Sequence, residues 1–518
     1  MALLSFSKRP LLQLILATTV IRCLVAHLIN LGNDEVYYFT YAVLPDWNHF
    51  DHPPLIGIFI RIFTINLNAI NELMIRLPGI VGAAINTWLI AQCGHHIKNV
   101  RTGIIAAILY NTSIYTSIIA GIFILPDSVQ LVFWLAALYS MLRCTGTDKA
   151  AVSQKHLLLI GLWTGLAIMS KVHGAFLWIG FLAFLAARKQ ESLRNPYLYA
   201  SLFLTLLLIS PILFWNINND FITLRFHSER VVITDHGINF KSFFRTTIGQ
   251  ILYANPVHIV LFVMAGKAIA RKQTFLTAPY MGLLLWSGIP IIICTIVLSL
   301  FRDTLPHWSG PGFIAFMLMA AAWLEERAAM PFYHRLINSC IGFMVFVFIA
   351  GPLLVRCYPG TMSPRKFPQT GSGDATLDIY GWDQLLPAFE KIRNDDIRRV
   401  TMSPQAPLLV HKWFPGAHIY YYVAYPLQMR LVGGGNIHDL HQFCWLNRSY
   451  GHVATGTNAW LIVPSNYFTD PVKQYAGQFK SIEKAGTITQ RRGGRIARYW
   501  FVYRLKHATQ RIGCNISI

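Results

Sequence analysis

Apolar runs of roughly 20 residues, separated by short polar or basic loops, recur through the chain as far as residue 357. A helix needs about 20 consecutive apolar residues to cross the hydrocarbon core of a bilayer, so each run predicts a membrane-spanning helix. The pattern predicts about eleven transmembrane helices and therefore a polytopic α-helical membrane protein. The expected spans are residues 10–32, 78–97, 101–120, 123–143, 156–170, 172–187, 197–217, 256–270, 277–300, 309–324 and 334–357.

The stretch 156–187 decides the topology. It is short for two spans and long for one, and Ser170 to Gly174 interrupt it. Two spans keep basic residues such as Arg143 and Arg188 on one face, as the cytoplasmic side requires, whereas a single span breaks this bias. We therefore expect a cytoplasmic N-terminus and an uncleaved first span. The opposite, extracytoplasmic face then holds the loops 33–77, 121–126, 218–255 and 301–308, the break at 170–174 and the chain from about 358.

The composition agrees with a membrane protein. Hydrophobic residues make up 54% of the chain and charged residues only 13%, whereas a soluble domain carries about 25% charged residues. The net charge of +21 could suggest nucleic acid. We reject that partner because the basic residues mostly flank apolar runs, where they orient helices and meet anionic membrane lipids.

From about residue 358 the apolar runs give way to Pro, Gly and charged residues. Short strand-like runs are separated by turn signals such as Gly433-Gly434-Gly435 and Gly493-Gly494. We therefore expect a transmembrane domain at 1–357 and a small extracytoplasmic α/β domain at 358–518. The expected strands are Leu408 to Val410, Ile419 to Val423, Ala459 to Val463 and Tyr499 to Leu505.

Two further expectations concern the cysteine and arginine residues of this C-terminal part. Cys444 and Cys514 could form a disulfide if the domain lies outside the cytoplasm, although a sequence does not show their proximity. Four arginines are interpreted as a solvated edge and not as a site: Arg491, Arg492, Arg495 and Arg498.

Ionisable residues gather in the first outer loop, directly after the first apolar run. Asp34 and Glu35 open this loop, and Asp51 and His52 follow beside a Pro-Pro pair. Charge held close to a membrane helix is costly, which makes these residues functional-site candidates. The aromatic residues between them predict short amphipathic helices anchored in the membrane interface: Tyr37, Tyr38, Phe39, Tyr41, Trp47 and Phe50.

Other unusual polar residues are expected on the same face. They are Asp127, Lys171, His173, His227, Glu229, Arg230, Arg302, Asp303, His307 and Trp308. Carboxylates and cations converging there suit acid/base chemistry on a substrate with an anionic leaving group. Simpler roles stay open, because Asp127 could cap a helix, Lys171 could extend to the membrane surface, and the arginines could meet anionic lipid. Metal-ligand spacing is absent, so the metal is unknown, no cofactor is certain and a divalent cation stays an open alternative.

Several segments together resemble the bacterial family 39/83 glycosyltransferases. The specific one is "DEVYYFTYAVLPDWNHFDHPPLIGIF", and the others follow in the same order as in that family. The family is related to the dolichyl-phosphate-mannose–protein mannosyltransferases and to the aminoarabinose transferase that modifies lipid A. The resemblance covers roughly residues 10–355. The further segments are "LPDSVQLVFWLAALY", "SKVHGAFLWIGF", "SPILFWNINNDFITLRFHSER" and "LPHWSGPGF".

The resemblance implies a GT-C fold and an active site that faces the periplasm or another lumen. It places the catalytic base on Asp34, with Glu35 beside it, and a second acidic position on Asp127. His52 stands where the aminoarabinose transferase has a Lys before its Pro. Contacts to the lipid phosphate are implied for Lys171, Arg302 and His307, and we add Asp51, His173 and Arg230 as substrate-binding candidates.

The expected reaction is transfer of a sugar from a polyprenyl-phosphate-linked donor to a hydroxyl of a lipid, glycan or protein acceptor. We expect this reaction to take place at the periplasmic face of the cell inner membrane. It would belong to lipopolysaccharide glycosylation or to protein glycosylation. A carboxylate can take the proton of the weakly nucleophilic hydroxyl, and cations can offset the charge of the leaving phosphate. The alternative is a transporter or flippase of lipid-linked sugars, but the polar residues gather at one face and no internal repeat is evident.

Overall fold

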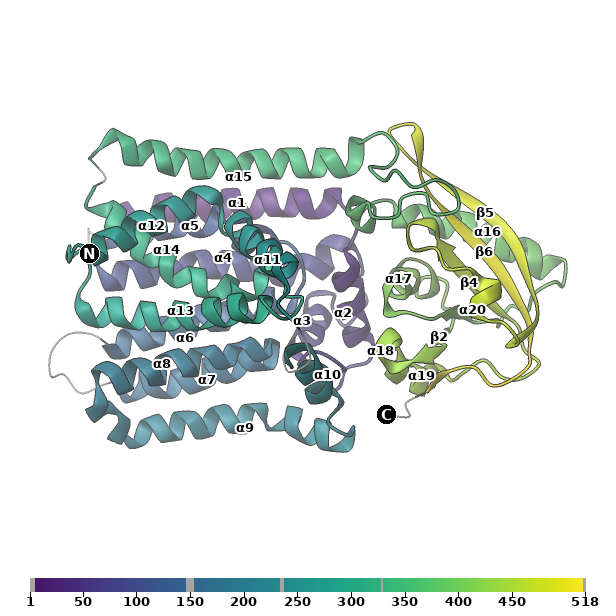
Figure 1. The fold of residues 1–518 in the computed structure, drawn as a ribbon, viewed down its shortest axis with the longest axis horizontal. Helices are drawn as coiled ribbons and strands as arrows, with labels where there is room; N and C mark the ends of the chain where they lie inside the picture. The colour runs from purple at the N-terminus through teal and green to yellow at the C-terminus, as the bar shows by residue number, and fades with distance from the viewer. Residues whose placement is uncertain (1–4, 146–152, 233–236, 328, 516–518) are drawn as a thin grey trace. The chain divides into compact units, whose positions relative to one another are not determined.

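The computed structural model describes residues 5–145, 153–232, 237–327 and 329–515. Contacts divide the chain into two compact units, which are described separately. The first unit comprises Met1–Val25 and Asp46–Phe348, and the second comprises Ala26–Pro45 and Ile349–Ile518. Figure 1 follows the chain from purple to yellow and labels most of its helices and several of its strands.

The first unit is helical. Its helices are α1 (Ser5–Leu28, which continues into the second unit), α3 (Leu55–Phe63), α4 (Glu72–Ile97), α5 (Val100–Asn111), α6 (Pro126–Thr145), α7 (Gln154–Ser170), α8 (Ala175–Arg188), α9 (Pro196–Asn218), α10 (Ile222–Val231), α11 (Phe240–Ala254), α12 (Pro256–Ala270), α13 (Ala278–Ser299), α14 (Gly310–Glu325) and α15 (Pro331–Cys357, which also continues into the second unit). Short turns join them: η2 (Tyr115–Ile119), η3 (Val172–Gly174), η4 (Gln190–Arg194) and η5 (Pro306–Ser309). Each predicted span coincides with a helical segment.

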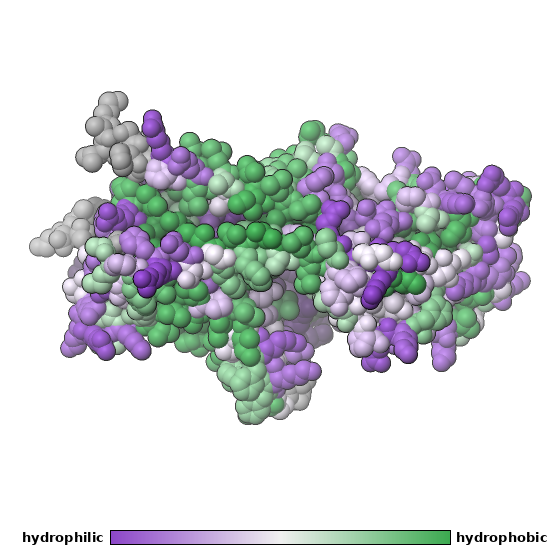
Figure 2. Space-filling view, turned by 90° about the horizontal axis from the view of Figure 1, so that it is seen from above, coloured by the Kyte–Doolittle hydropathy of each residue, from purple (hydrophilic) through white to green (hydrophobic). Residues whose placement is uncertain are grey.

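Among the described residues, six helices are long and apolar enough to cross a membrane, or seven if α11 and α12, bent by 91°, count as one span. Other predicted spans are shorter helices, such as α5. Figure 2 shows apolar residues over much of the helical surface. On α9 the side chains of Phe203 and Phe214 are 67% and 63% exposed. Exposed apolar side chains of this size, repeated along a helix, suit contact with lipid.

Small residues set the closest helix contacts. A Cβ on Gly94 of α4 would lie 2.7 Å from the Cα of Gly103 on α5. Only the absence of both side chains allows this approach, which is typical of helix pairs in membranes.

The break expected at Ser170 to Gly174 is confirmed. Helix α7 ends at Ser170, Lys171 is extended with φ −156° and ψ 133°, and η3 leads into α8. The break therefore places a lysine between two helices, where its backbone no longer follows the helix.

The second unit contains α2 (Asn33–Val43) and an α/β arrangement. Its sheet has the order β2-β1-β4-β6-β5, in which β1 is parallel to β2 and β4, and β6 is antiparallel to β4 and β5. A second sheet pairs β3 with β7. The strands are β1 (Leu408–Val410), β2 (Leu431–Gly433), β3 (Gly435–Asn436), β4 (Ala459–Pro464), β5 (Phe479–Arg492), β6 (Arg495–Ala508) and β7 (Cys514–Asn515).

Helices and short turns pack around this sheet. They are η6 (Ala375–Ile379), η7 (Trp382–Gln384), α16 (Leu385–Arg398), α17 (Trp413–Ile419), η8 (Tyr420–Ala424), α18 (Ile437–Leu440), α19 (Phe443–Tyr450), η9 (Ser465–Tyr467) and α20 (Pro471–Gln474). The small α/β architecture is as expected from the sequence. Gly493 and Gly494, with φ of 52° and 78°, form the β5–β6 turn, because this hairpin turn needs positive φ at both positions.

Three of the expected strands are confirmed and one is wrong. Residues 408–410, 459–463 and 499–505 lie in β1, β4 and β6, but Ile419 to Val423 form the end of α17 and the π-helical turn η8. All of these last residues are buried. A short apolar run that is buried on every side has no periodicity to separate a strand from a helix.

The helix α2 belongs to the second unit, so the observed units differ from the division expected at residue 357. Its aromatic residues do not lie exposed as interface anchors. Tyr37 packs on Trp413 with ring centroids 5.1 Å apart, and Phe39 packs on Tyr421 at 5.0 Å. The expectation of anchors is therefore wrong for these residues, and also for the buried Phe50, whereas Trp47 is 68% exposed.

Candidate active site

A buried ion pair forms the centre of the polar residues in the first unit. The Lys171 Nζ lies 2.8 Å from the Asp127 Oδ2, and the two side chains are 5% and 2% exposed. The Tyr115 hydroxyl donates a hydrogen bond of 3.0 Å to the other carboxylate oxygen. Lys171 is therefore buried in a pair and does not extend to the membrane surface, and Asp127 does more than cap α6.

The residues around this ion pair lie where helices are interrupted: after α7, in η2 and at the start of α14. Lys171 follows the end of α7, and its carbonyl accepts a hydrogen bond of 2.8 Å from the Gln130 side chain on α6. Tyr115 lies in η2, beside Gly310 at the start of α14. A Cβ on Gly310 would lie 2.3 Å from the Tyr115 ring, so the glycine leaves room for the ring that bonds to Asp127.

Two histidines flank the pair. Burial lowers the pKa of His307, in η5, to about 4, although the Asp127 charge acts in the opposite direction. His307 is therefore neutral at pH 7. His173, in η3, packs on Trp308 with ring centroids 5.7 Å apart, and its Nδ1 is buried without a hydrogen-bond partner among the residues described. Two neutral imidazoles near a lysine can each donate one hydrogen bond to an anionic group.

The second half of the first outer loop packs on α10. The Asp51 carbonyl accepts a hydrogen bond of 2.7 Å from the His227 Nε2, and the Phe50 and Phe226 rings lie 4.7 Å apart. The Asp51 carboxylate lies 3.3 Å from the His52 Nδ1. Burial, followed by the nearby His52, lowers the pKa of His227 to about 4. His227 is thus a neutral donor that holds the loop.

The two candidate arginines lie at the end of α10 and in the loop before η5. Arg302 donates to the main-chain carbonyl of Glu229, and the exposed Arg230 lies with its guanidinium carbon 4.5 Å from the centroid of the Phe226 ring. No group of three or more metal-ligating side chains occurs among the described residues.

Asp34 and Glu35 lie in the first turn of α2, in the second unit. Asp34 is exposed. Glu35 is 2% exposed, and its Oε2 accepts a hydrogen bond of 2.8 Å from the Gly32 main-chain nitrogen. Glu35 therefore caps the helix, which leaves Asp34 as the more accessible carboxylate of the two.

The structure thus brings together part of the predicted set. Asp127 and Lys171 are in contact, and Asp51 and His52 are in contact, whereas Asp34 and Glu35 are on the other compact unit. Sequence reasoning named His227 among the polar residues of the outer loop 218–255 but did not select Tyr115 or Gln130. These two residues occur within apolar segments and carry no separate signal.

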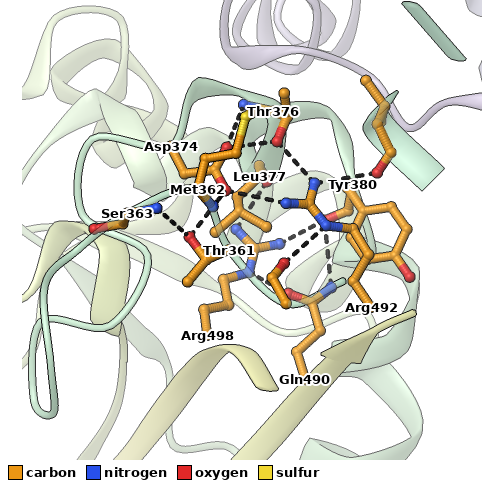
Figure 3. A network of polar contacts seen from close by, with 12 residues as sticks. Thr361, Met362, Ser363, Asp374, Thr376, Leu377, Tyr380, Gln490, Arg492 and Arg498 are labelled. Carbon is orange, nitrogen blue, oxygen red and sulfur yellow. Dashed lines mark hydrogen bonds and ion pairs between the residues drawn. The ribbon is translucent and has the colours of Figure 1, made fainter. Parts of the chain in front are cut away.

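In the second unit, two fully buried arginines lie at the centre of a polar network (Figure 3). Arg492 pairs with Asp374 at 3.0 Å, and Arg498 donates to the carbonyls of Leu377 and Tyr380 at 2.9 and 2.8 Å. The expected solvated edge is therefore wrong for these two arginines. Arg492 of β5 and Arg498 of β6 hold the segment 374–380, which follows α15 in the chain, against the β5–β6 hairpin.

Comparison with known proteins gives a family match and a fold. Residues 51–215 match the family described as dolichyl-phosphate-mannose-protein mannosyltransferase. The structure is similar to ArnT from Cupriavidus metallidurans in the apo state, with a TM-score of 0.65, 12% identity, and coverage of 95% of this chain and 97% of that chain. The same protein bound to undecaprenyl phosphate matches with a TM-score of 0.62, 12% identity and the same coverage. No curated protein matches the chain.

A more distant similarity is to the archaeal oligosaccharyltransferase AglB from Archaeoglobus fulgidus, with a TM-score of 0.46, 14% identity, and coverage of 86% of this chain and 69% of that chain. At 12% identity, the similarity to ArnT establishes the fold, which is GT-C. Together with the family match, it confirms the resemblance to GT-C glycosyltransferases related to ArnT and the protein mannosyltransferases.

Proposed function

We propose that the protein transfers a sugar from a polyprenyl-phosphate-linked donor to a hydroxyl of a lipid, glycan or protein acceptor. The observation that carries this proposal is the buried Asp127–Lys171 pair, which lies inside the mannosyltransferase match at 51–215 and on a GT-C fold. The similar ArnT structure has been solved with undecaprenyl phosphate bound, which supports a donor of this chemical class.

Asp34 is the proposed base. Its carboxylate takes the proton of the acceptor hydroxyl while the hydroxyl oxygen bonds to the anomeric carbon of the sugar. The bond between that carbon and the phosphate oxygen breaks, and polyprenyl phosphate leaves with both electrons of the bond. The accessible position of Asp34 in the first turn of α2 supports this role over Glu35, whose carboxylate caps the helix.

The remaining residues are proposed to hold the donor. Lys171 and His307 offer hydrogen bonds to the leaving phosphate, and Asp127 fixes the lysine in place. His52, His173, Arg230 and Arg302 are further substrate-binding candidates, together with Asp51. Cationic and neutral donors of this kind offset the developing phosphate charge without requiring a bound metal.

The proposed location is the cell inner membrane, with a cytoplasmic N-terminus and an extracytoplasmic C-terminal domain. Cys444 and Cys514 form a disulfide with a Cα–Cα distance of 5.3 Å, as the sequence suggested for a domain outside the cytoplasm. Disulfides persist in oxidising compartments and are rare in the cytosol. The disulfide supports the periplasmic placement.

The experiment that tests the proposal compares lipids and glycans of cells that carry the wild-type protein, no protein or Asp34→Asn. We expect one glycoconjugate to lose a sugar-sized mass in both mutants, because the amide cannot accept the hydroxyl proton. Membrane levels of the variant protein, measured by immunoblot, should equal those of the wild type. Normal glycosylation in Asp34→Asn cells would remove Asp34 as the base, and identical glycoconjugates with and without the protein would contradict transfer.

A further inference from the structure

We propose that Asn33 is a positioning residue, through which the C-terminal domain orients the base Asp34. This inference rests on the proposed function. It concerns a side chain that the sequence did not single out and that lies next to Asp34 in α2. The contacts that carry it lie entirely within the second unit, in which α2 and the C-terminal residues are grouped.

The Asn33 amide bridges two residues of the C-terminal part. Its Nδ2 donates to the Asp378 Oδ2 at 3.1 Å, and its Oδ1 lies 2.9 Å from the His418 Nε2. An amide oxygen only accepts, so the His418 Nε2 carries the proton in this contact. The nitrogen and the oxygen of the Asn33 amide thus each make a hydrogen bond, and together the two bonds fix the orientation of the amide plane.

The partners of Asn33 are themselves held in place. Asp378 accepts hydrogen bonds from the Tyr467 hydroxyl at 3.0 and 3.1 Å. Arg498 donates to the carbonyls of Leu377 and Tyr380 and so fixes the backbone on either side of Asp378 (Figure 3). The polar network of the β5–β6 hairpin therefore extends to Asp378, the residue that accepts the hydrogen bond from Asn33 of α2.

His418 is fixed by stacking. Its ring lies parallel to that of Trp382, with centroids 4.1 Å apart and planes 12° apart. The Trp382 main-chain nitrogen in turn donates to the Asn30 Oδ1 at 3.1 Å. The same aromatic pair thus contacts α2 through Asn33 and the loop before α2 through Asn30.

The residues before Asn33 are tied to the C-terminal part by their backbone. The Asn30 nitrogen donates to the Ile379 carbonyl at 3.1 Å, and the Leu31 nitrogen donates to the Tyr422 hydroxyl at 2.8 Å. After Asn33 comes Asp34, whose side chain is exposed, and then Glu35, which caps the helix. The chain directly before Asp34 is therefore held by hydrogen bonds at Asn30, Leu31 and Asn33.

The rate of transfer depends on where the Asp34 carboxylate lies. A general base must lie within hydrogen-bond reach of the proton that it removes, and a displacement of about 1 Å can cost on the order of 100-fold in rate. Loss of the Asn33 bridge should release the first turn of α2 while the cluster around Lys171 keeps its own contacts. The rate of transfer should fall and the fold should remain.

The test uses full-length protein in membrane vesicles from producing cells, with their own donor and acceptor. The variant Asn33→Ala should lower the rate of glycoconjugate formation roughly 10- to 100-fold. Asn436→Ala is the matched control, since Asn436 also makes two side-chain hydrogen bonds within the second unit, both to Asp439. Its rate should stay within about twofold of the wild type, because neither bond involves α2.

Two further measurements separate positioning from a general structural role. The double variant Asn33→Asp/Asp378→Asn reverses the donor and the acceptor, so it should recover most of the rate, whereas Asn33→Asp alone opposes two carboxylates and should be the least active. Hydrogen exchange of the purified protein should increase in residues 30–44 for Asn33→Ala and remain unchanged in the strands β4 and β6.

The outcomes distinguish this inference from the proposed function. If Asp34→Asn abolishes transfer while Asn33→Ala retains the full rate, the positioning role is wrong and the base assignment stands. If the reciprocal variant is as inactive as Asn33→Asp, the contact with Asp378 does not orient the base. If membranes without the protein form the glycoconjugate as fast as the wild type, the proposed function itself fails.

Discussion

Removal of the Lys171 charge is the perturbation whose cost follows most directly from the structure. In Lys171→Met the carboxylate of Asp127, 2% exposed, keeps the Tyr115 hydroxyl but loses its cation. A buried pair that loses one partner is destabilised by about 3–5 kcal/mol, because the remaining charge is left without compensation. We therefore expect the free energy of unfolding to fall by about this amount.

The double variant Asp127→Asn/Lys171→Met separates stability from activity. Both charges are removed, and the amide oxygen introduced at position 127 can still accept from Tyr115, so the protein should regain at least ~2 kcal/mol relative to Lys171→Met. Transfer should remain low, because no lysine is left to meet the donor phosphate. Stability is measured by chemical unfolding of the purified protein in detergent, and activity by glycoconjugate formation in membranes.

Two results would refute this reasoning. Stability of Lys171→Met within about 1 kcal/mol of the wild type would show that water reaches the pair and screens it. A double variant no more stable than Lys171→Met would show that the lysine acts through packing of its aliphatic chain. Full transfer activity in the double variant would separately remove Lys171 from the proposed donor site.

Three further predictions follow from particular contacts. The pKa of His227 is about 4 in the folded protein and 6.5 ordinarily, so between these values the unfolded state binds more protons at this residue. The contribution of His227 to stability should therefore fall by ~2 kcal/mol from pH 7 to pH 5, and His227→Gln should reduce the total fall in unfolding measurements by about this amount. Cys444→Ser opens a disulfide between residues 70 apart in sequence and should cost ~4 kcal/mol, with no further loss on adding a reductant. Gly310→Ala would place a Cβ 2.3 Å from the Tyr115 ring; the ring that bonds to Asp127 must then shift, so transfer should fall and stability should decrease by ~1–3 kcal/mol. Gly266→Ala, with no atom within 4 Å of the added Cβ, should change neither.

The sequence predicted those features that depend on local pattern. Apolar runs located the helices, and the polar residues at Ser170 to Gly174 located the break that carries Lys171. The Gly493-Gly494 pair located the β5–β6 turn, in which both glycines have positive φ. The disulfide between Cys444 and Cys514 is confirmed, although only the fold shows that these cysteines meet.

Features that depend on tertiary contacts were not predictable in this way. The aromatic residues of α2 match the composition of an interfacial helix, but Tyr37 packs on Trp413, 376 positions later in the chain, and Phe39 packs on Tyr421, 382 positions later. Asp127 and Lys171 were both recognised as candidates, yet only the fold shows that they pair with each other. Arg498 is buried against carbonyl oxygens, which no charge pattern reveals.

The most direct test of the proposed function is reconstitution of the purified protein into liposomes that contain a radiolabelled polyprenyl-phosphate sugar and the acceptor fraction from a strain without the protein. We predict that the label moves from the polyprenyl phosphate to the acceptor with the wild-type protein and stays on the donor with Asp34→Asn. Label that crosses the bilayer while still attached to polyprenyl phosphate, with none on the acceptor, would contradict transfer and identify a flippase.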